Sequence, residues 1–131
     1  MIMNLGALKF LYIFIALSSL TFSVYSKPIE ANIAKIQILD KITARMKNFS
    51  VDIENSIYFE SLEIKIFSCY KNPPEEIPEN FVFLEIYDKI NTKNNNLIYR
   101  GWMISSSPAS TPLEHPIYDV WLKDCAIRID F

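Results

Sequence analysis

Short segments in which apolar and polar residues alternate, each ended by a turn, constrain the fold of this 131-residue chain more than any other feature. In the clearest, which begins at Leu62, Leu and Ile alternate with Glu and Lys, the period of a strand with one buried face. Phe67 breaks the alternation, so we expect a β-bulge or a strand end near Cys69. The expected strands are residues 56–59, 62–69, 81–87, 97–104 and 118–131. They predict an all-β fold, a small antiparallel sandwich or open barrel of about six to eight short strands.

Proline and asparagine separate these strands. KNPPEEIPEN (71–80) and SSSPASTPLEHP (105–116) each hold three prolines, which exclude regular structure, and residues 91–96 form a polar turn. Between the first loop and this turn, FVFLEIY (81–87) is apolar on both faces except at Glu85. It is therefore expected to be a central strand.

Gly101 is the only glycine after residue 26. It lies inside an expected strand, directly before Trp102. Glycine at such a position marks a structural turn, a bulge or a close approach of another backbone. We therefore expect a bulge or close approach there that aims the Trp102 ring at the core, beside the C-terminal strand.

The first 26 residues have the features of a cleaved signal peptide. Lys9 and the amino terminus supply the positive charge, residues 10–20 are apolar, and Val24 and Ser26 fit a cut before Lys27. The alternative is an uncleaved anchor, but the apolar run 10–25 has 16 residues, fewer than the roughly 20 that span a bilayer. The expected organisation is a signal peptide (1–26), an entry segment (27–32) and one β-rich domain (33–131). This organisation predicts a periplasmic protein without stable membrane insertion after cleavage.

The net charge and the two cysteines limit the molecules and cofactors that this chain is expected to bind. Without residues 1–26 the chain carries 12 basic and 15 acidic side chains, a net charge of −3, and no basic block. Nucleic acid and anionic lipid are therefore not expected partners. Cys69 and Cys125 are the only cysteines, and in an oxidising compartment they are expected to form a disulfide. With one His and no C-x-x-C spacing, neither a metal nor a cofactor is expected.

Residues 33–49 fit two structures. Their large apolar residues recur at spacings of three and four, which suits one face of a helix. The same segment also fits two short strands around a turn at Asp40 and Lys41, with Ile36 and Ile38 on one face.

Five stretches of the chain resemble a mostly alphaproteobacterial family catalogued as domain of unknown function 2155. They are LDKITAR (39–45), LEIKIFSCYKNPP (62–74), FVFLEIY (81–87), GWMISSSPA (101–109) and LEHPIYDVWLKDC (113–125). The resemblance implies an exported, β-rich protein with two matching cysteines, and a strand–turn–strand at LDKITAR, which favours the strand pair over the helix. It also places glycines where this chain has Asn55 and Glu60. It implies no activity.

LEHPIYDVWLKDC gathers the residues that could do chemistry. His115 could act as a general acid or base if Glu114, Asp119 or Asp124 oriented its ring. That arrangement would make the protein a small hydrolase. However, Pro116 fixes the backbone after His115, so we favour the interpretation that this histidine holds backbone groups of its loop.

Aromatic residues carry the other candidate function. Trp102 and Trp121, with His115 and Tyr118, could form a surface that binds an envelope protein or a glycan, although at least one tryptophan is expected to be buried. The preferred hypothesis is a non-catalytic, exported binding module; the alternatives are the hydrolase and an assembly role through an exposed strand edge.

Overall fold

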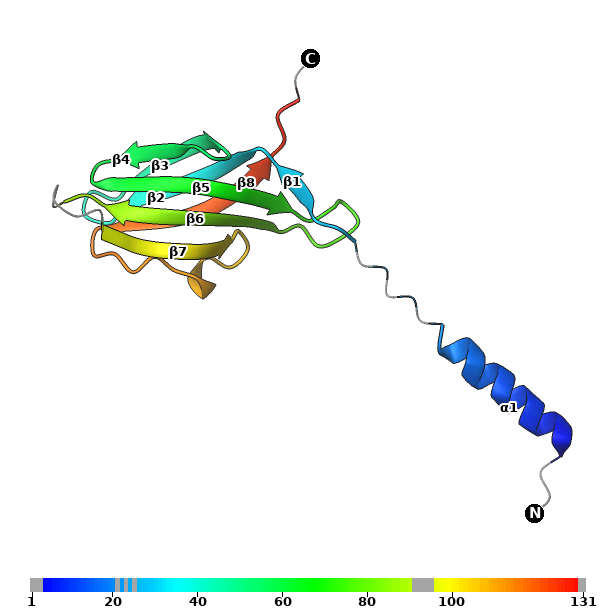
Figure 1. Cartoon of the computed structure of the whole chain (residues 1–131). Helices are drawn as coiled ribbons and strands as arrows, with labels where there is room; N and C mark the ends of the chain where they lie inside the picture. Colours follow the sequence, from blue (N-terminus) through cyan, green and yellow to red (C-terminus); the bar gives the residue numbers. More distant parts are fainter. Residues whose placement is uncertain (1–3, 21, 23, 25, 91–95, 130–131) are drawn as a thin grey trace.

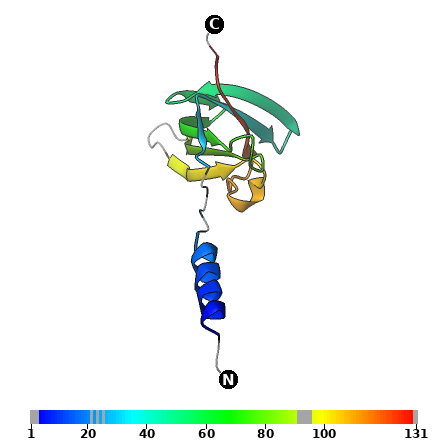
Figure 2. The ribbon, with the colours of Figure 1, turned by 90° about the vertical axis from the view of Figure 1, so that its right-hand side faces the viewer.

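The computed structural model describes residues 4–20, 22, 24, 26–90 and 96–129. They form one helix, α1 (Leu5–Ser18), a short 3-10 helix, η1 (Pro108–Ser110), and eight strands in two antiparallel sheets (Figures 1 and 2). The all-β fold expected from the sequence, a small antiparallel sandwich or open barrel, is confirmed, with two antiparallel sheets. Residues 91–95 of the expected turn lie outside the described residues.

The larger sheet has the strand order β1-β5-β6-β7, and β4 also pairs with β5. Its strands are β1 (Ile29–Ala31), β4 (Ser56–Phe59), β5 (Leu62–Lys71), β6 (Asn80–Asp88) and β7 (Asn96–Ile104). Strand β6, which contains FVFLEIY, lies between β5 and β7, and its Val82, Leu84 and Ile86 are fully buried. The predicted central strand is therefore confirmed.

The smaller sheet has the order β3-β2-β8, with β2 (Ile33–Asp40) between β3 (Arg45–Asp52) and β8 (Tyr118–Ala126). Residues 33–49 thus form the strand pair rather than a helix. Ile36 and Ile38 share the buried face, whereas Ile42 and Met46, which completed the helical spacing, are exposed. The segment forms strands and not a helix because β2 is paired with β3 on one side and with β8 on the other.

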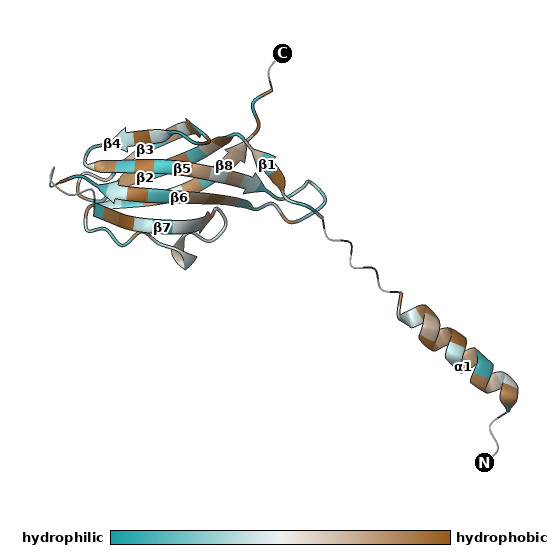
Figure 3. Ribbon diagram, viewed as in Figure 1, coloured by the Kyte–Doolittle hydropathy of each residue, from teal (hydrophilic) through white to brown (hydrophobic). Residues whose placement is uncertain are grey.

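The core lies between the sheets and is closed by a disulfide between Cys69 of β5 and Cys125 of β8, whose Cα atoms are 5.8 Å apart. The register of β5 against β6 shifts between Ile66 and Ser68, which confirms the bulge expected from Phe67. This shift moves Cys69 onto the buried face, although strict alternation from Leu62 would place it outside. In Figure 3 the hydropathy colours alternate along the strands accordingly.

Gly101 has a backbone conformation that favours glycine, with a φ of +158°, but the bulge expected at this position is not there. It pairs with Leu84 in a regular stretch of the ladder, and the irregularity between β6 and β7 lies between Ile86 and Tyr87. A Cβ at Gly101 would meet only the Tyr99 side chain, at 3.7 Å or more. The space beside Gly101 is used by Tyr99, whose hydroxyl donates to the Trp102 carbonyl at 3.0 Å. Trp102 is 45% exposed and pairs with Phe83 on the outer face, so the expectation that it points into the core is wrong.

Helix α1 contributes nothing to this core. None of its residues is buried, and it lies apart from the sandwich in both ribbon views (Figures 1 and 2). Within the described part of the chain, no helix combines the length and the apolar character needed to cross a membrane. Cleavage of a signal peptide after Ser26 stays a prediction.

Candidate functional site

His115 is held on both sides of its ring. Its Nδ1 accepts hydrogen bonds from the backbone N–H groups of Ile117 and Tyr118, each at 3.1 Å. Because Nδ1 is an acceptor, the ring proton sits on Nε2, which donates to Oδ2 of Asp88 at 3.0 Å. The residue is 8% exposed, and its ring stacks on Tyr118 with a centroid distance of 5.2 Å. Both nitrogens are therefore occupied within the protein.

The carboxylate beside His115 is not one that the sequence indicated. Asp119 pairs with Lys41 at 3.3 Å, Asp124 pairs with Lys71 at 3.7 Å, and Glu114 is exposed. Asp88, at the end of β6, takes the place that these three were expected to fill. Only the fold brings it to His115.

The environment of Asp88 favours its charged form. Burial alone would raise the pKa of this carboxyl. Hydrogen bonds from His115, Ser61 and the Ile90 N–H outweigh burial and lower the pKa from its ordinary value of 3.8. Asp88 is thus a stable anionic partner for the histidine.

Two further buried carboxylates lie on the outer face of the larger sheet. Glu63 is bound by Lys89 at 2.6 Å and by the Tyr58 hydroxyl at 3.1 Å, and the hydrogen bond from Lys89 is the main cause that lowers the pKa of Glu63. Glu85 is bound by Arg100 and Tyr87, at 3.1 Å and 2.6 Å. Among the described residues, no group of His, Cys, Asp and Glu could hold a metal ion.

Next to these ion pairs the outer face becomes aromatic. Phe83 packs against Phe67 and Trp102 with centroid distances of 5.9 Å and 5.3 Å, and Trp102 lies 6.0 Å from Tyr70. We call these four residues the aromatic cluster. They come from the three adjacent strands β5, β6 and β7, and the β5 bulge helps to gather them on one face.

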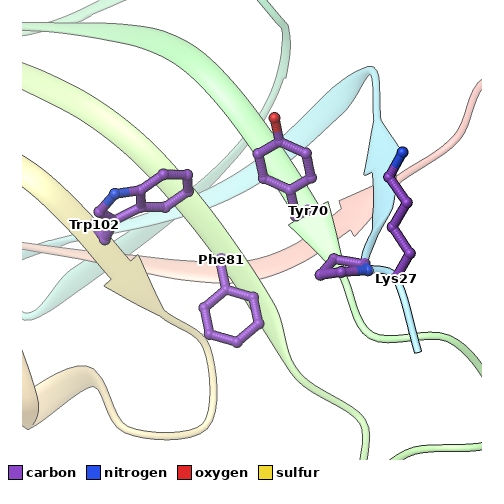
Figure 4. A pocket seen from close by; sticks show the side chains of 5 residues that line it. Lys27, Tyr70, Phe81 and Trp102 are labelled. Atoms are coloured by element: carbon purple, nitrogen blue, oxygen red, sulfur yellow. The ribbon is translucent and has the colours of Figure 1, made fainter. Parts of the chain in front are cut away.

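A groove of about 340 Å³ opens at one end of the aromatic cluster. It is lined by Lys27, Pro28, Tyr70, Phe81 and Trp102. Figure 4 shows the rings of Tyr70, Phe81 and Trp102 around the hollow, with Lys27 beside Tyr70. Apart from the ammonium of Lys27, the walls consist almost entirely of rings and aliphatic carbon.

The structure separates the four residues that the sequence suggested as one binding surface. Trp102 lies on the outer face of the larger sheet, while His115 and Tyr118 are buried. Trp121 pairs with Gln37 and lies on the outer face of the smaller sheet, because its neighbours Val120 and Leu122 face the core.

The sequence did not lead us to expect that Phe67, Tyr70, Phe81 and Phe83 would form the aromatic cluster and the groove. One signal was available: Phe81 and Phe83 alternate with Val82 and Leu84, so one face of that strand is aromatic.

Residues 34–125 match the model of a family described as "Uncharacterized protein conserved in bacteria", domain of unknown function 2155 (DUF2155). The chain belongs to this family. The matched span of this DUF2155 domain contains both cysteines and the whole aromatic cluster, but it begins after Lys27 and Pro28 of the groove.

One curated relative is the uncharacterized protein RP359 of Rickettsia prowazekii (strain Madrid E), 34% identical over 91 residues. The alignment covers 70% of this chain and 59% of that protein, so the chain spans about three fifths of the relative. No solved structure matches the chain.

Proposed function

We propose that this DUF2155 domain is an exported, non-catalytic module of the bacterial periplasm that binds another envelope protein through the aromatic cluster. The proposal is supported by four aromatic residues gathered on the outer face beside an open groove, of which Phe67 and Trp102 are exposed and Tyr70 and Phe83 half-buried. Exposed apolar patches of this kind mark interaction sites, since in water they are costly to leave uncovered. Large aromatic side chains also dominate the binding energy of protein interfaces.

The groove favours a protein ligand over a glycan. Sugar hydroxyls need hydrogen-bond partners, and burying them without such partners is unfavourable. The walls formed by Pro28, Phe81 and the ring faces of Tyr70 and Trp102 offer few. Apolar peptide side chains need none.

The environment of His115 supports binding over hydrolysis. A general base must reach the substrate proton with a free nitrogen. Here Nε2 donates to Asp88 and Nδ1 accepts from two backbone groups. The disulfide supports export, because such bonds persist in oxidising compartments such as the periplasm.

Site-specific crosslinking in living cells tests this function. A photoreactive phenylalanine analogue is placed at position 102, and the matched control carries it at position 121, the tryptophan on the opposite sheet. We expect a discrete crosslinked protein in the envelope fraction from position 102 and none from position 121. Equal crosslinking at both positions, or none at either, contradicts the proposed binding surface.

A further inference from the structure

We infer that cleavage after Ser26 completes the groove by placing the new amino terminus at its rim, and that the groove then takes an extended peptide carrying proline or another apolar residue beside an acidic one. This inference rests on the proposed function and names the ligand of the same site. It follows from the position of Lys27, from the charge that cleavage creates, and from the aromatic lining.

The position of Lys27 is set by the strand that follows it. Lys27 and Pro28 line the groove directly before β1, whose Ile29, Glu30 and Ala31 pair with Lys71, Tyr70 and Cys69 of β5. The β1 ladder thus anchors the chain one residue beyond the groove. Processing at the expected site would cut the backbone at the rim of the groove and not at a distance from it (Figure 4).

Cleavage changes the charge at that rim. In the uncut chain, Lys27 contributes one positive charge and its backbone nitrogen is an uncharged amide. After cleavage the same residue carries an α-ammonium and an ε-ammonium group, two positive charges where the uncut chain has one. Lys27 forms no ion pair with another residue in the described ranges, whereas nearby Lys71 is paired with Asp124. The rim would therefore offer two cationic groups to a ligand carboxylate.

The rest of the groove selects for apolar groups. Tyr70, Phe81 and Trp102 project from adjacent, hydrogen-bonded strands, so their backbones are held in place before a ligand arrives. Aromatic-lined grooves bind extended, proline-containing segments with little loss of ligand entropy, because such segments are already stiff. An acidic neighbour of the apolar residue would meet Lys27. The positive charge of Lys27 and the aromatic lining together determine the ligand class, an apolar residue beside an acidic one.

Selection from a random peptide library displayed on phage tests the ligand class. The bait is the disulfide-bonded chain that begins at Lys27; α1 buries no residue, so this chain retains the complete core. We expect the selected peptides to be enriched in Asp or Glu next to proline or apolar residues. Each selected peptide should bind at least tenfold more weakly to Lys27→Glu and to Trp102→Ala, and equally well to Lys123→Glu on the smaller sheet.

Two further baits test the α-ammonium separately from the Lys27 side chain and verify that the variants are folded. Acetylation of the α-amino group should weaken binding at least threefold, because it removes one of the two cationic groups. Trp102→Phe should retain most of the binding, and thermal unfolding of each variant verifies that the domain is intact.

Several outcomes would overturn the inference. They are an empty selection, peptides without acidic enrichment, and affinities that do not respond to Lys27→Glu. The inference would also be overturned by self-association that depends on concentration and is lost in Trp102→Ala, because a second copy of the chain would then fill the groove. If crosslinking at position 102 persists while the selection fails, the binding function stands and only the ligand class is wrong.

Discussion

Nε2 of His115 lies 3.0 Å from Oδ2 of Asp88, and this contact joins the two sheets at one end of the sandwich. Asp88 ends β6 of the larger sheet, and His115 holds the first residue of β8 in the smaller one. The disulfide joins the sheets at the other end, because Cys69 pairs with the start of β6 and Cys125 lies near the end of β8. One polar link and one covalent link thus close opposite ends of the core.

The polar link should be measurable as a coupling energy. His115→Gln should lower the free energy of unfolding by about 1–3 kcal/mol, because the flexible amide cannot accept from both backbone N–H groups and donate to Asp88 with the geometry of the ring. Asp88→Asn keeps an acceptor but loses the charge, so its effect should be smaller. Urea unfolding of the single and double variants gives the coupling, expected to be about 0.5–3 kcal/mol. The adjacent, exposed Glu114→Gln is the control, and additive effects of His115→Gln and Asp88→Asn would contradict the link.

Acid should destabilise the domain through carboxylates whose pKa is lowered in the folded state by the groups that bind them. The pKa values of Asp88, Glu63 and Glu79 lie below their ordinary values of 3.8, 4.5 and 4.5. A lowered pKa in the folded state contributes stability above the ordinary value, which is lost as the pH falls through the lower, folded-state value. Unfolding free energies should therefore be flat from about pH 7 to about pH 5 and fall below about pH 4.

Glu79 offers a way to separate these contributions. Burial would raise the pKa of Glu79, but hydrogen bonds from Ser106, Ser105 and the Asn80 N–H lower it. In Glu79→Gln the fall below about pH 4 should be shallower than in the wild type, because one carboxylate no longer takes up a proton on unfolding. An unchanged pH profile would show that this carboxylate does not link the loop at 71–80 to Ser105 and Ser106.

The disulfide should supply a large part of the stability. For a closed loop of about 57 residues, the loop-entropy relation gives about 4 kcal/mol, reduced by any strain in the native state. Cys69→Ala should therefore unfold at a lower denaturant concentration, and the wild type should melt lower in reductant. The double variant Cys69→Ala/Cys125→Ala should melt identically with and without reductant. Two titratable thiols in protein purified from the producing cell under non-reducing conditions would contradict the bond.

Local patterns in the sequence were enough for the strands but not for the site. The interruption at Phe67 predicts the bulge that turns Cys69 inward, because alternation is a local property. The His115–Asp88 contact joins residues 27 positions apart, so it depends on how the sheets pack. Trp102 lies on the outer face because it pairs with Phe83. The position of Gly101 alone does not specify this register. For residues 33–49, the spacing of the apolar residues fitted both a helix and a strand pair, and the family resemblance decided in favour of the strands.

The turn between β4 and β5 contains a strained residue. Phe59 pairs with Leu62, so Glu60 and Ser61 make a two-residue turn, in which Glu60 has a φ of +50°. Side chains with a Cβ pay about 1–2 kcal/mol for this backbone conformation, and glycine does not. Glu60→Gly should therefore stabilise the domain by about 0.5–1 kcal/mol after its greater unfolded-state entropy is counted.

Ser61→Gly is the comparison that should lose stability, because Ser61 lacks a positive φ and the change also removes its hydrogen bond to Asp88. A loss in both variants, measured by urea unfolding, would contradict the strain. The family resemblance also placed a glycine at Asn55, but here the positive φ, +69°, belongs to the preceding Glu54.

Processing before Lys27 is the prediction on which the completed groove depends. Mass spectrometry of protein purified from whole producing cells should give a chain that begins at Lys27, with two hydrogens fewer than the reduced mass because of the disulfide. Because α1 buries no residue, the full chain and the chain from Lys27 should have unfolding free energies within about 0.5 kcal/mol of each other. A mass that retains Met1 would mean an anchored protein. In that protein the α-ammonium is absent from the groove, and Lys27 would contribute its side-chain charge alone.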